Sequence, residues 1–254
     1  MGATCPYLLP SMTRATWRGA RGIVISADWL FEDDIIWVDG LPITRPDRSV
    51  TFAARRARSD EEATQIIDMA AAGDQIDLLG LEDYVSRLPS RPGVRRLRRA
   101  LAQADENAWS PMEVTMRRLW TGRGFDRPLC NRPIFDLNGR HLLTPDLFDP
   151  VAGVLGEYNG AVHLNLRVGH RDLNREEICR QLGLEMVSMM STDLRDKSAF
   201  EWRLDNAYRR AAARPLTTNW TLDLPSSWVD TSTVAKRRAL DESQRELWLR
   251  RQAG

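Results

Sequence analysis

The sequence has little lysine, little cysteine, no long apolar run and almost no net charge. Only Lys197 and Lys236 are lysines among its 36 basic residues, and 35 acidic residues nearly balance the total. Without a basic excess, composition alone does not indicate a nucleic-acid partner, and only a local basic patch would bind one. No segment is long and apolar enough to span a membrane.

The three cysteines, Cys5, Cys130 and Cys179, are widely spaced. An odd number at these spacings indicates neither a disulfide framework nor a zinc site, and it suits a reducing compartment. Residues 1–22 lack the apolar centre of a signal peptide, and Pro6 breaks the myristoylation pattern. We therefore expect a cytoplasmic protein, with no membrane partner.

Residues 1–107 are predicted to form a small α/β domain. Alternating apolar residues predict two short strands within residues 22–40. Pro46 can open a helix, because proline is tolerated in the first turn. Ser59 and Glu62 have the spacing of a capping box at the start of the next helix.

A further helix near the end of this domain is rich in arginine. Val94, Leu97 and Leu101 would face inward, and the other faces carry Arg91, Arg95, Arg96, Arg98 and Arg99. Charge runs of this kind are usually a solvated helix surface. The alternative is that these arginines contact a phosphate backbone, which makes them candidate DNA-binding residues.

Residues 108–213 are predicted to form a second α/β domain. Ser110 caps its first helix and Glu113 completes a capping box, while Asn138-Gly139 favours a tight hairpin turn between two strands. A strand, a helix, a strand and a helix follow, at residues 151–160, 174–183, 184–190 and 198–212. This order predicts a mixed sheet flanked by helices.

Two local predictions concern the end of the chain. Ser198 and Glu201 have the spacing of a third capping box. Residues 214–254 read as a tail with one or two short basic helices, which would dock on the core or pack on a partner. Three tryptophans on or beside helices are assigned to the core: Trp109, Trp120 and Trp202.

Acidic residues gather around the predicted strands of the second domain. Asp146 stands at the end of the hairpin's second strand, and Glu157 lies in the next strand. Adjacent antiparallel strands can bring such residues side by side, where a divalent cation would offset their repulsion. Asn159 shares a strand face with Glu157, and His163 follows closely.

Each of these residues also has a structural explanation. Glu113 can serve only as a capping residue, Asp146 can shape a turn, and Asn159 can belong to a turn with Gly160. Glu157 is the hardest to explain in this way, because carboxylates are rarely buried without a partner. An ion pair with Arg140 or Arg175 would account for it.

The segments "SPMEVTMRRLW", "TPDLFDPVAGVLGEYNGAVH" and "RDLNREEICRQLGLEMV" resemble the restriction-endonuclease-like (PD-(D/E)xK) superfamily. More narrowly, they resemble the very-short-patch-repair-like endonuclease domains found in actinobacterial AbiEi-like antitoxin proteins. "DGLPITRPDRSV" resembles the region that precedes that domain, although the usual N-terminal winged helix is not visible.

The resemblance implies a restriction-endonuclease-like fold and a metal-dependent DNA endonuclease in phage defence or DNA processing. It places the metal, Mg²⁺ or Mn²⁺, on Asp146 and Glu157. The wider set of catalytic candidates is Glu113, Asp146, Glu157, Asn159 and His163, and Asp172 with Arg175 matches a helix pair of the family. His163 or Arg175 would touch the phosphate, so Arg175 is a further candidate DNA-binding residue. Asn159 stands where lysine or aspartate is usual. The alternative is therefore an inactive nuclease-fold regulator or antitoxin, which would bind DNA or a toxin.

Overall fold

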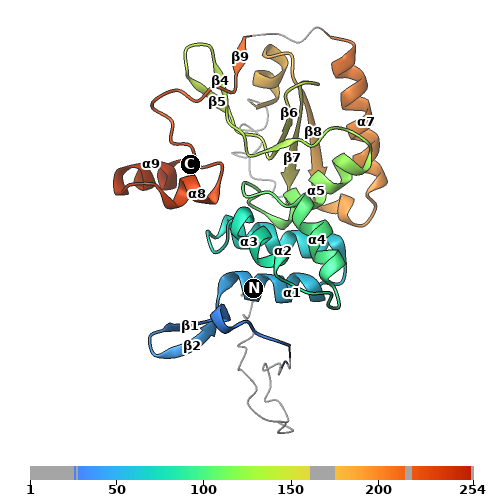
Figure 1. The fold of residues 1–254 in the computed structure, drawn as a ribbon. Coiled ribbons are helices and arrows are strands. Elements are labelled where there is room, and N and C mark those ends of the chain that lie inside the picture. The colour runs from blue at the N-terminus through green and yellow to red at the C-terminus, as the bar shows by residue number, and fades with distance from the viewer. Residues whose placement is uncertain (1–25, 27, 161–174, 215–218, 253–254) are drawn as a thin grey trace.

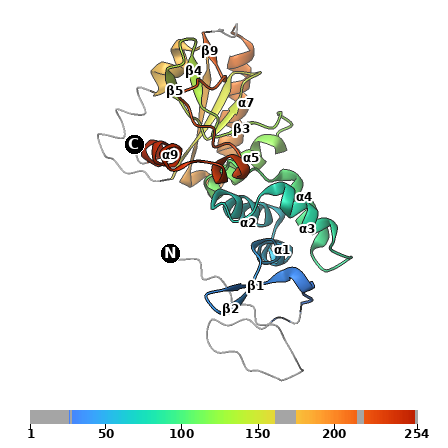
Figure 2. The ribbon, with the colours of Figure 1, turned by 60° about the vertical axis from the view of Figure 1, so that its left-hand side comes forward.

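The computed structural model describes residues 26, 28–160, 175–214 and 219–252. A β-ribbon and a group of helices come first along the chain, a sheet flanked by helices follows, and the C-terminal segment contacts both (Figures 1 and 2). The protein is therefore of mixed α/β class, as the order of predicted elements indicates.

The ribbon consists of β1 (Ile35–Val38) and β2 (Leu41–Thr44), which pair antiparallel and follow the 3-10 turn η1 (Glu32–Asp34). Asp39-Gly40 joins the strands with φ angles of 50° and 76°, as a tight hairpin turn of this length requires. The prediction of two strands within residues 22–40 is wrong in one respect. Described residues 26 and 28–30 form no strand, and β1 pairs with residues beyond that range.

Four helices, which we call the helical unit, follow the ribbon: α1 (Pro46–Arg56), α2 (Asp60–Ala72), α3 (Leu78–Ser86) and α4 (Val94–Gln103). Pro46 opens α1 and Ser59 Oγ accepts the Glu62 backbone N–H at 3.0 Å, as predicted. The capping box is only half formed, because the Glu62 carboxylate accepts from Arg58 N rather than from Ser59 N.

The helical unit has its own apolar core. Ala54, Ile67, Leu81 and Leu97, one from each helix, are fully buried in a single cluster. Helices α1 and α4 approach closely at Gly93, where an added Cβ would lie 2.1 Å from Arg55 O and where φ is +82°. Only glycine fits this position, so close packing and backbone conformation both depend on it.

A second group of elements, which we call the sheet unit, begins with α5 (Pro111–Gly122) and ends with α7 (Ser198–Ala212). Its main sheet has the order β3-β6-β7-β8, in which β7 and β8 are parallel and the other neighbours antiparallel. The bounds of these strands are Leu129–Cys130, Leu147–Asp149, Val154–Asn159 and Glu185–Met190.

The two faces of the main sheet are covered differently. On one face, Leu147, Val154 and Val187 pack with buried side chains of α5 and α7. On the other, Phe148 and Leu155 pack with the helix of residues 175–181 and with a smaller sheet. This alternation along each strand buries the main sheet on both sides.

The smaller sheet has the order β5-β4-β9 and contains the predicted hairpin. Its strands are β4 (Ile134–Asp136), β5 (His141–Leu143) and β9 (Trp220–Thr221). The Asn138-Gly139 turn is confirmed, with φ of +82° at Gly139. The placement of Asp146 at the end of this hairpin is wrong, because Asp146 precedes β6 in the other sheet.

Two predictions are wrong in whole or in part: the capping box at Ser198 and the burial of three tryptophans. The predicted capping box at Ser198 is absent: Lys197 is the N-cap, and Ser198 Oγ donates to Asp196 Oδ1 at 2.6 Å just after the 3-10 turn η2 (Ser191–Leu194). Trp120 is fully buried as predicted, whereas Trp109 and Trp202 are exposed to 41% and 66%.

The tail docks on the helical unit through α8 (Val234–Arg238), and α9 (Glu242–Gln252) follows. Val234 is fully buried in the core of the helical unit. Arg237 is buried beside it, donating from Nε to Asp74 Oδ1 at 2.7 Å and from Nη2 to Ala71 O at 2.8 Å. Of the two alternatives for the tail, docking on the core is therefore observed for α8.

Candidate functional site

The main sheet brings Asp146 and Glu157 together at one end. In the antiparallel pairing of β6 with β7, Leu147 lies opposite Gly156, so the next step of the register places Asp146 opposite Glu157. The Asp146 carboxylate accepts a hydrogen bond from Tyr158 N at 2.7 Å, which fixes this acid against the strand that carries the other.

Gly156 sets the depth of the strand that carries Glu157. A Cβ at this position would lie 2.9 Å from the Trp120 ring and 3.3 Å from Met116 Sδ, both on α5. The absence of a side chain therefore lets β7 lie directly against α5. The same helix carries Glu113, so the close packing of β7 against α5 also affects how closely Glu113 lies to the strand that carries Glu157.

Arg175 supplies positive charge to this pair of acids. Its guanidinium forms an ion pair with the Glu157 carboxylate and donates from Nη2 to Thr144 O at 3.1 Å. Of the two arginines considered from the sequence as partners of Glu157, the structure pairs Arg175 with it. The charge of Arg175 also acts on Asp146, where it opposes the rise in pKa caused by burial.

Burial changes the ionisation of Asp146 and Glu113. For Asp146, burial raises the pKa above the ordinary value, while the Tyr158 N–H and Arg175 lower it in part. For Glu113, burial is again the main cause of a raised pKa, and repulsion by Asp146 adds to it. The two carboxylates therefore interact, although their residues are far apart in the sequence.

Glu113 has a defined structural role in addition. Ser110 Oγ accepts the Glu113 backbone N–H at 3.2 Å, as predicted for the helix cap. The side chain does not close the capping box on Ser110, because its Oε2 accepts from Trp109 N at 2.8 Å and from Asn131 Nδ2 at 2.7 Å. The carboxylate is therefore held by two donors.

Asn131 is a site residue that the sequence reasoning missed. It has a positive φ of 45°, and its backbone N–H donates to Asp146 O at 3.0 Å while its amide donates to Glu113. It thus connects the segment before β6 with the start of α5. No motif marks it, because this role depends on contacts between elements that are distant in the sequence.

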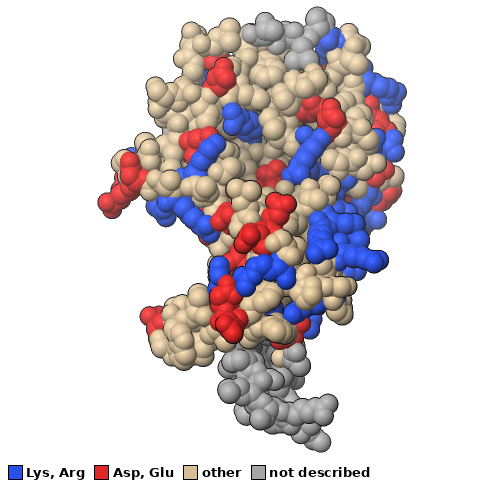
Figure 3. Space-filling view, in the orientation of Figure 1, with Lys and Arg blue, Asp and Glu red and all other residues tan. Residues whose placement is uncertain are grey.

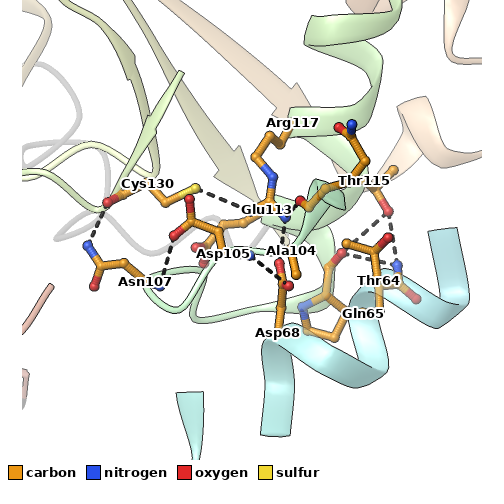
Figure 4. A network of polar contacts seen from close by, with 12 residues as sticks. Thr64, Gln65, Asp68, Ala104, Asp105, Asn107, Glu113, Thr115, Arg117 and Cys130 are labelled. Carbon is orange, nitrogen blue, oxygen red and sulfur yellow. Dashed lines mark hydrogen bonds and ion pairs between the residues drawn. The ribbon is translucent and has the colours of Figure 1, made fainter. Parts of the chain in front are cut away.

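A buried polar network extends from this point to the helical unit (Figure 4). Asn107 Nδ2 donates to Cys130 O at 2.6 Å, and Arg117 Nη1 donates to Cys130 Sγ at 3.2 Å. Arg117 Nη2 in turn donates to Asp68 Oδ2 at 2.5 Å, which joins α5 to α2. Burial raises the pKa of Asp68 to about 6, against the charge and hydrogen bond of Arg117.

The remaining predicted site residues are Asn159, His163 and Asp172. Asn159 is exposed at the last position of β7, two residues after Glu157 and on the same face of the strand. His163 and Asp172 lie outside the described residues. Within the described ranges, no group of three or more histidine, cysteine, aspartate or glutamate side chains could hold a metal ion.

The predicted DNA-binding arginines divide into two groups. Arg91, Arg96 and Arg99 form ion pairs within the protein, with Asp28 at 3.6 Å, Asp60 at 3.6 Å and Asp60 at 2.7 Å. Arg95 and Arg98 are exposed, and neither forms a hydrogen bond or ion pair with another described residue. Figure 3 shows basic side chains gathered over α4, at the right of the molecule.

Comparison with protein-family models, with curated proteins and with solved structures finds no match. Among the described residues, no helix has both the length and the apolar character needed to cross a membrane.

Proposed function

We propose that this protein is a metal-dependent DNA endonuclease with a restriction-endonuclease-like fold. The observation that carries the proposal is the position of Asp146, just before β6 and hydrogen-bonded to Tyr158 N, opposite Glu157 of the adjacent strand β7 in a mixed sheet flanked by helices. The resemblance noted in the sequence assigns the metal to these two acids, and the β6–β7 register, extended by one residue, supports that assignment.

The donor set fits a hard divalent cation. Magnesium is commonly bound through one or two carboxylates, with waters and substrate phosphates completing the coordination. Asp146 and Glu157 would hold Mg²⁺ or Mn²⁺, and the bound ion would supply Lewis-acid and water-activating chemistry for phosphodiester hydrolysis. Arg175 provides a positive charge at the same place, so a cation that binds Glu157 must compete with the Arg175 guanidinium.

The other side chains have supporting roles in this proposal. Glu113 is held by two donors and repels Asp146, so it orients the acid pair rather than moving freely. Asn159 presents an exposed amide on the same strand face as Glu157 and can orient a water or a phosphate. The exposed Arg95 and Arg98 on α4 would contact the DNA backbone, whereas Arg91, Arg96 and Arg99 chiefly stabilise the fold.

A second candidate function is a non-cleaving DNA-binding regulator or antitoxin. Two observations favour it: Arg175 already neutralises Glu157, and Asn159 replaces the usual lysine or aspartate of the family. In this case the acid pair and its arginine would serve only to hold β5, β7 and the helix of residues 175–181 together.

Plasmid DNA distinguishes the two functions. We expect nicking in Mg²⁺ or Mn²⁺, none in chelator, and none in Asp146→Ala or Glu157→Ala. Asp205→Ala is the matched control, because Asp205 forms a surface ion pair with Arg123 on the other side of the sheet unit's core. If the protein and the two site variants bind DNA equally well and none of them nicks it under any condition, the endonuclease proposal is wrong and the regulator is supported.

A further inference from the structure

The guanidinium of Arg175 is incompletely satisfied. Its Nη2 serves both Glu157 and Thr144 O, whereas its Nε is buried and has no hydrogen-bond partner among the described residues. A buried N–H without an acceptor costs free energy, and most such groups in folded proteins are paired. An additional oxygen acceptor beside Arg175 would therefore be stabilised.

The same guanidinium competes with any divalent cation for Glu157. Glu157 and Asp146 share the charge of Arg175, and the Glu157 side chain is only 16% exposed. A cation that binds Glu157 must therefore displace Arg175 or share the carboxylate with it. Displacement costs less if the guanidinium gains a phosphate, because arginine binds phosphate with two parallel hydrogen bonds.

We propose that Arg175 is a displaceable internal counter-cation that couples metal binding to DNA binding. In the free protein it neutralises Glu157. When DNA binds, a backbone phosphate takes the guanidinium and leaves Glu157 to the divalent cation. This inference rests on the proposed endonuclease function and adds a regulatory role for a positioning residue at the same site.

A thermodynamic consequence follows from this competition. If DNA removes Arg175 from Glu157, DNA raises the affinity for the metal, and the metal raises the affinity for DNA by the same factor. A purely structural Arg175, which only ties the helix of residues 175–181 to Thr144, would produce no such coupling. The two roles therefore differ in a binding measurement that does not require cleavage.

The experiment measures Mn²⁺ binding to the full-length protein by calorimetry, with and without a short duplex whose phosphorothioate linkages resist hydrolysis. For the unsubstituted protein we expect the duplex to tighten Mn²⁺ binding by about tenfold, or about 1.4 kcal/mol. For Arg175→Met we expect tight Mn²⁺ binding without the duplex, little further gain with it, and weaker DNA binding. Arg175→Lys, which retains the charge without the planar fork, should retain part of the coupling.

Arg140→Met is the matched control, because Arg140 is an exposed arginine in the turn between β4 and β5. It should reproduce the coupling of the unsubstituted protein, and thermal melting should show that every variant is folded. Equal Mn²⁺ affinity in Arg175→Met and the unsubstituted protein, or duplex enhancement that persists in Arg175→Met, overturns the inference and leaves the endonuclease standing. If no Mn²⁺ binding depends on Asp146 and Glu157 in either protein, the endonuclease proposal itself fails.

Discussion

Two arginine–carboxylate pairs in this protein have the same chemistry and different surroundings. Asp68 and Arg117 join the two units with side-chain exposures of 0% and 3%, and Arg117 also donates to Gln103 O and Cys130 Sγ. Glu157 and Arg175 lie at the end of the main sheet with exposures of 16% and 36%, and Arg175 Nε has no described partner. The surroundings therefore distinguish the buried pair of Asp68 and Arg117, which joins the two units, from the more exposed pair of Glu157 and Arg175, in which we propose that the arginine changes partners.

The largest expected effect is at the buried joint. Asp68→Ala should lower the free energy of unfolding by about 3–5 kcal/mol, because it leaves the enclosed charge of Arg117 without compensation. The double variant Asp68→Ala with Arg117→Met should recover much of that loss. Chemical denaturation of both single variants and of the double variant gives the coupling energy, and strictly additive losses would contradict the description of a buried pair.

The corresponding change at the sheet end should cost less. Glu157→Ala should lower the free energy of unfolding by about 1 kcal/mol, because solvent can reach the remaining Arg175. The same denaturation experiment measures it. A loss as large as that of Asp68→Ala would show that both pairs are structural joints, and the contrast between them would disappear.

The effect of burial on the ionisation of Asp146 can be tested by the pH dependence of thermal stability. Burial raises the pKa of Asp146 above the value of 3.8 that it has when exposed, so this group favours the folded state less as pH rises through the folded pKa. Asp146→Asn removes the buried charge and can still accept from Tyr158 N. It should raise Tm at neutral pH, with a difference that vanishes as pH falls below about 3.8. A lower Tm at neutral pH would mean that the charge of Asp146 is stabilising.

The smallest effect on stability is expected on the surface of α4. Replacing Arg95 and Arg98 together by glutamine should change the free energy of unfolding by less than about 0.5 kcal/mol. It should weaken DNA binding and reduce the slope of log affinity against log salt by about 2. A titration over a range of salt concentrations measures this slope, and Arg99→Gln, which breaks the pair with Asp60, serves as the comparison.

Local signals in the sequence predicted much of the secondary structure. The caps at Ser59 and Ser110, the proline at Pro46 and the turn at Asn138-Gly139 each act through neighbouring residues, and each is observed. The predicted capping box at Ser198 does not form, because the Ser198 hydroxyl donates to Asp196 instead. Helix α3 was not predicted, although Asp77 caps it by accepting the Gly80 N–H at 2.8 Å.

The candidate site was predictable only in part. The pattern alone placed Glu157 in a strand but assigned Asp146 to the end of the hairpin. The division of residues 129–159 into two sheets, which puts Asp146 just before β6, depends on non-local pairing. Asn131 and the unsatisfied Arg175 Nε have no sequence signature, because both arise where distant segments meet. The same holds for the exposure of Trp202, which helical spacing did not indicate.

The docking of α8 has a consequence for biosynthesis. Val234 and Arg237 complete the interior of the helical unit, yet the ribosome makes them long after α1 to α4. Helices α1 to α4 therefore lack part of their apolar core while the sheet unit is being translated. The nascent chain is most susceptible to association or proteolysis during this interval. The docking of α8 on the helical unit ends that exposure.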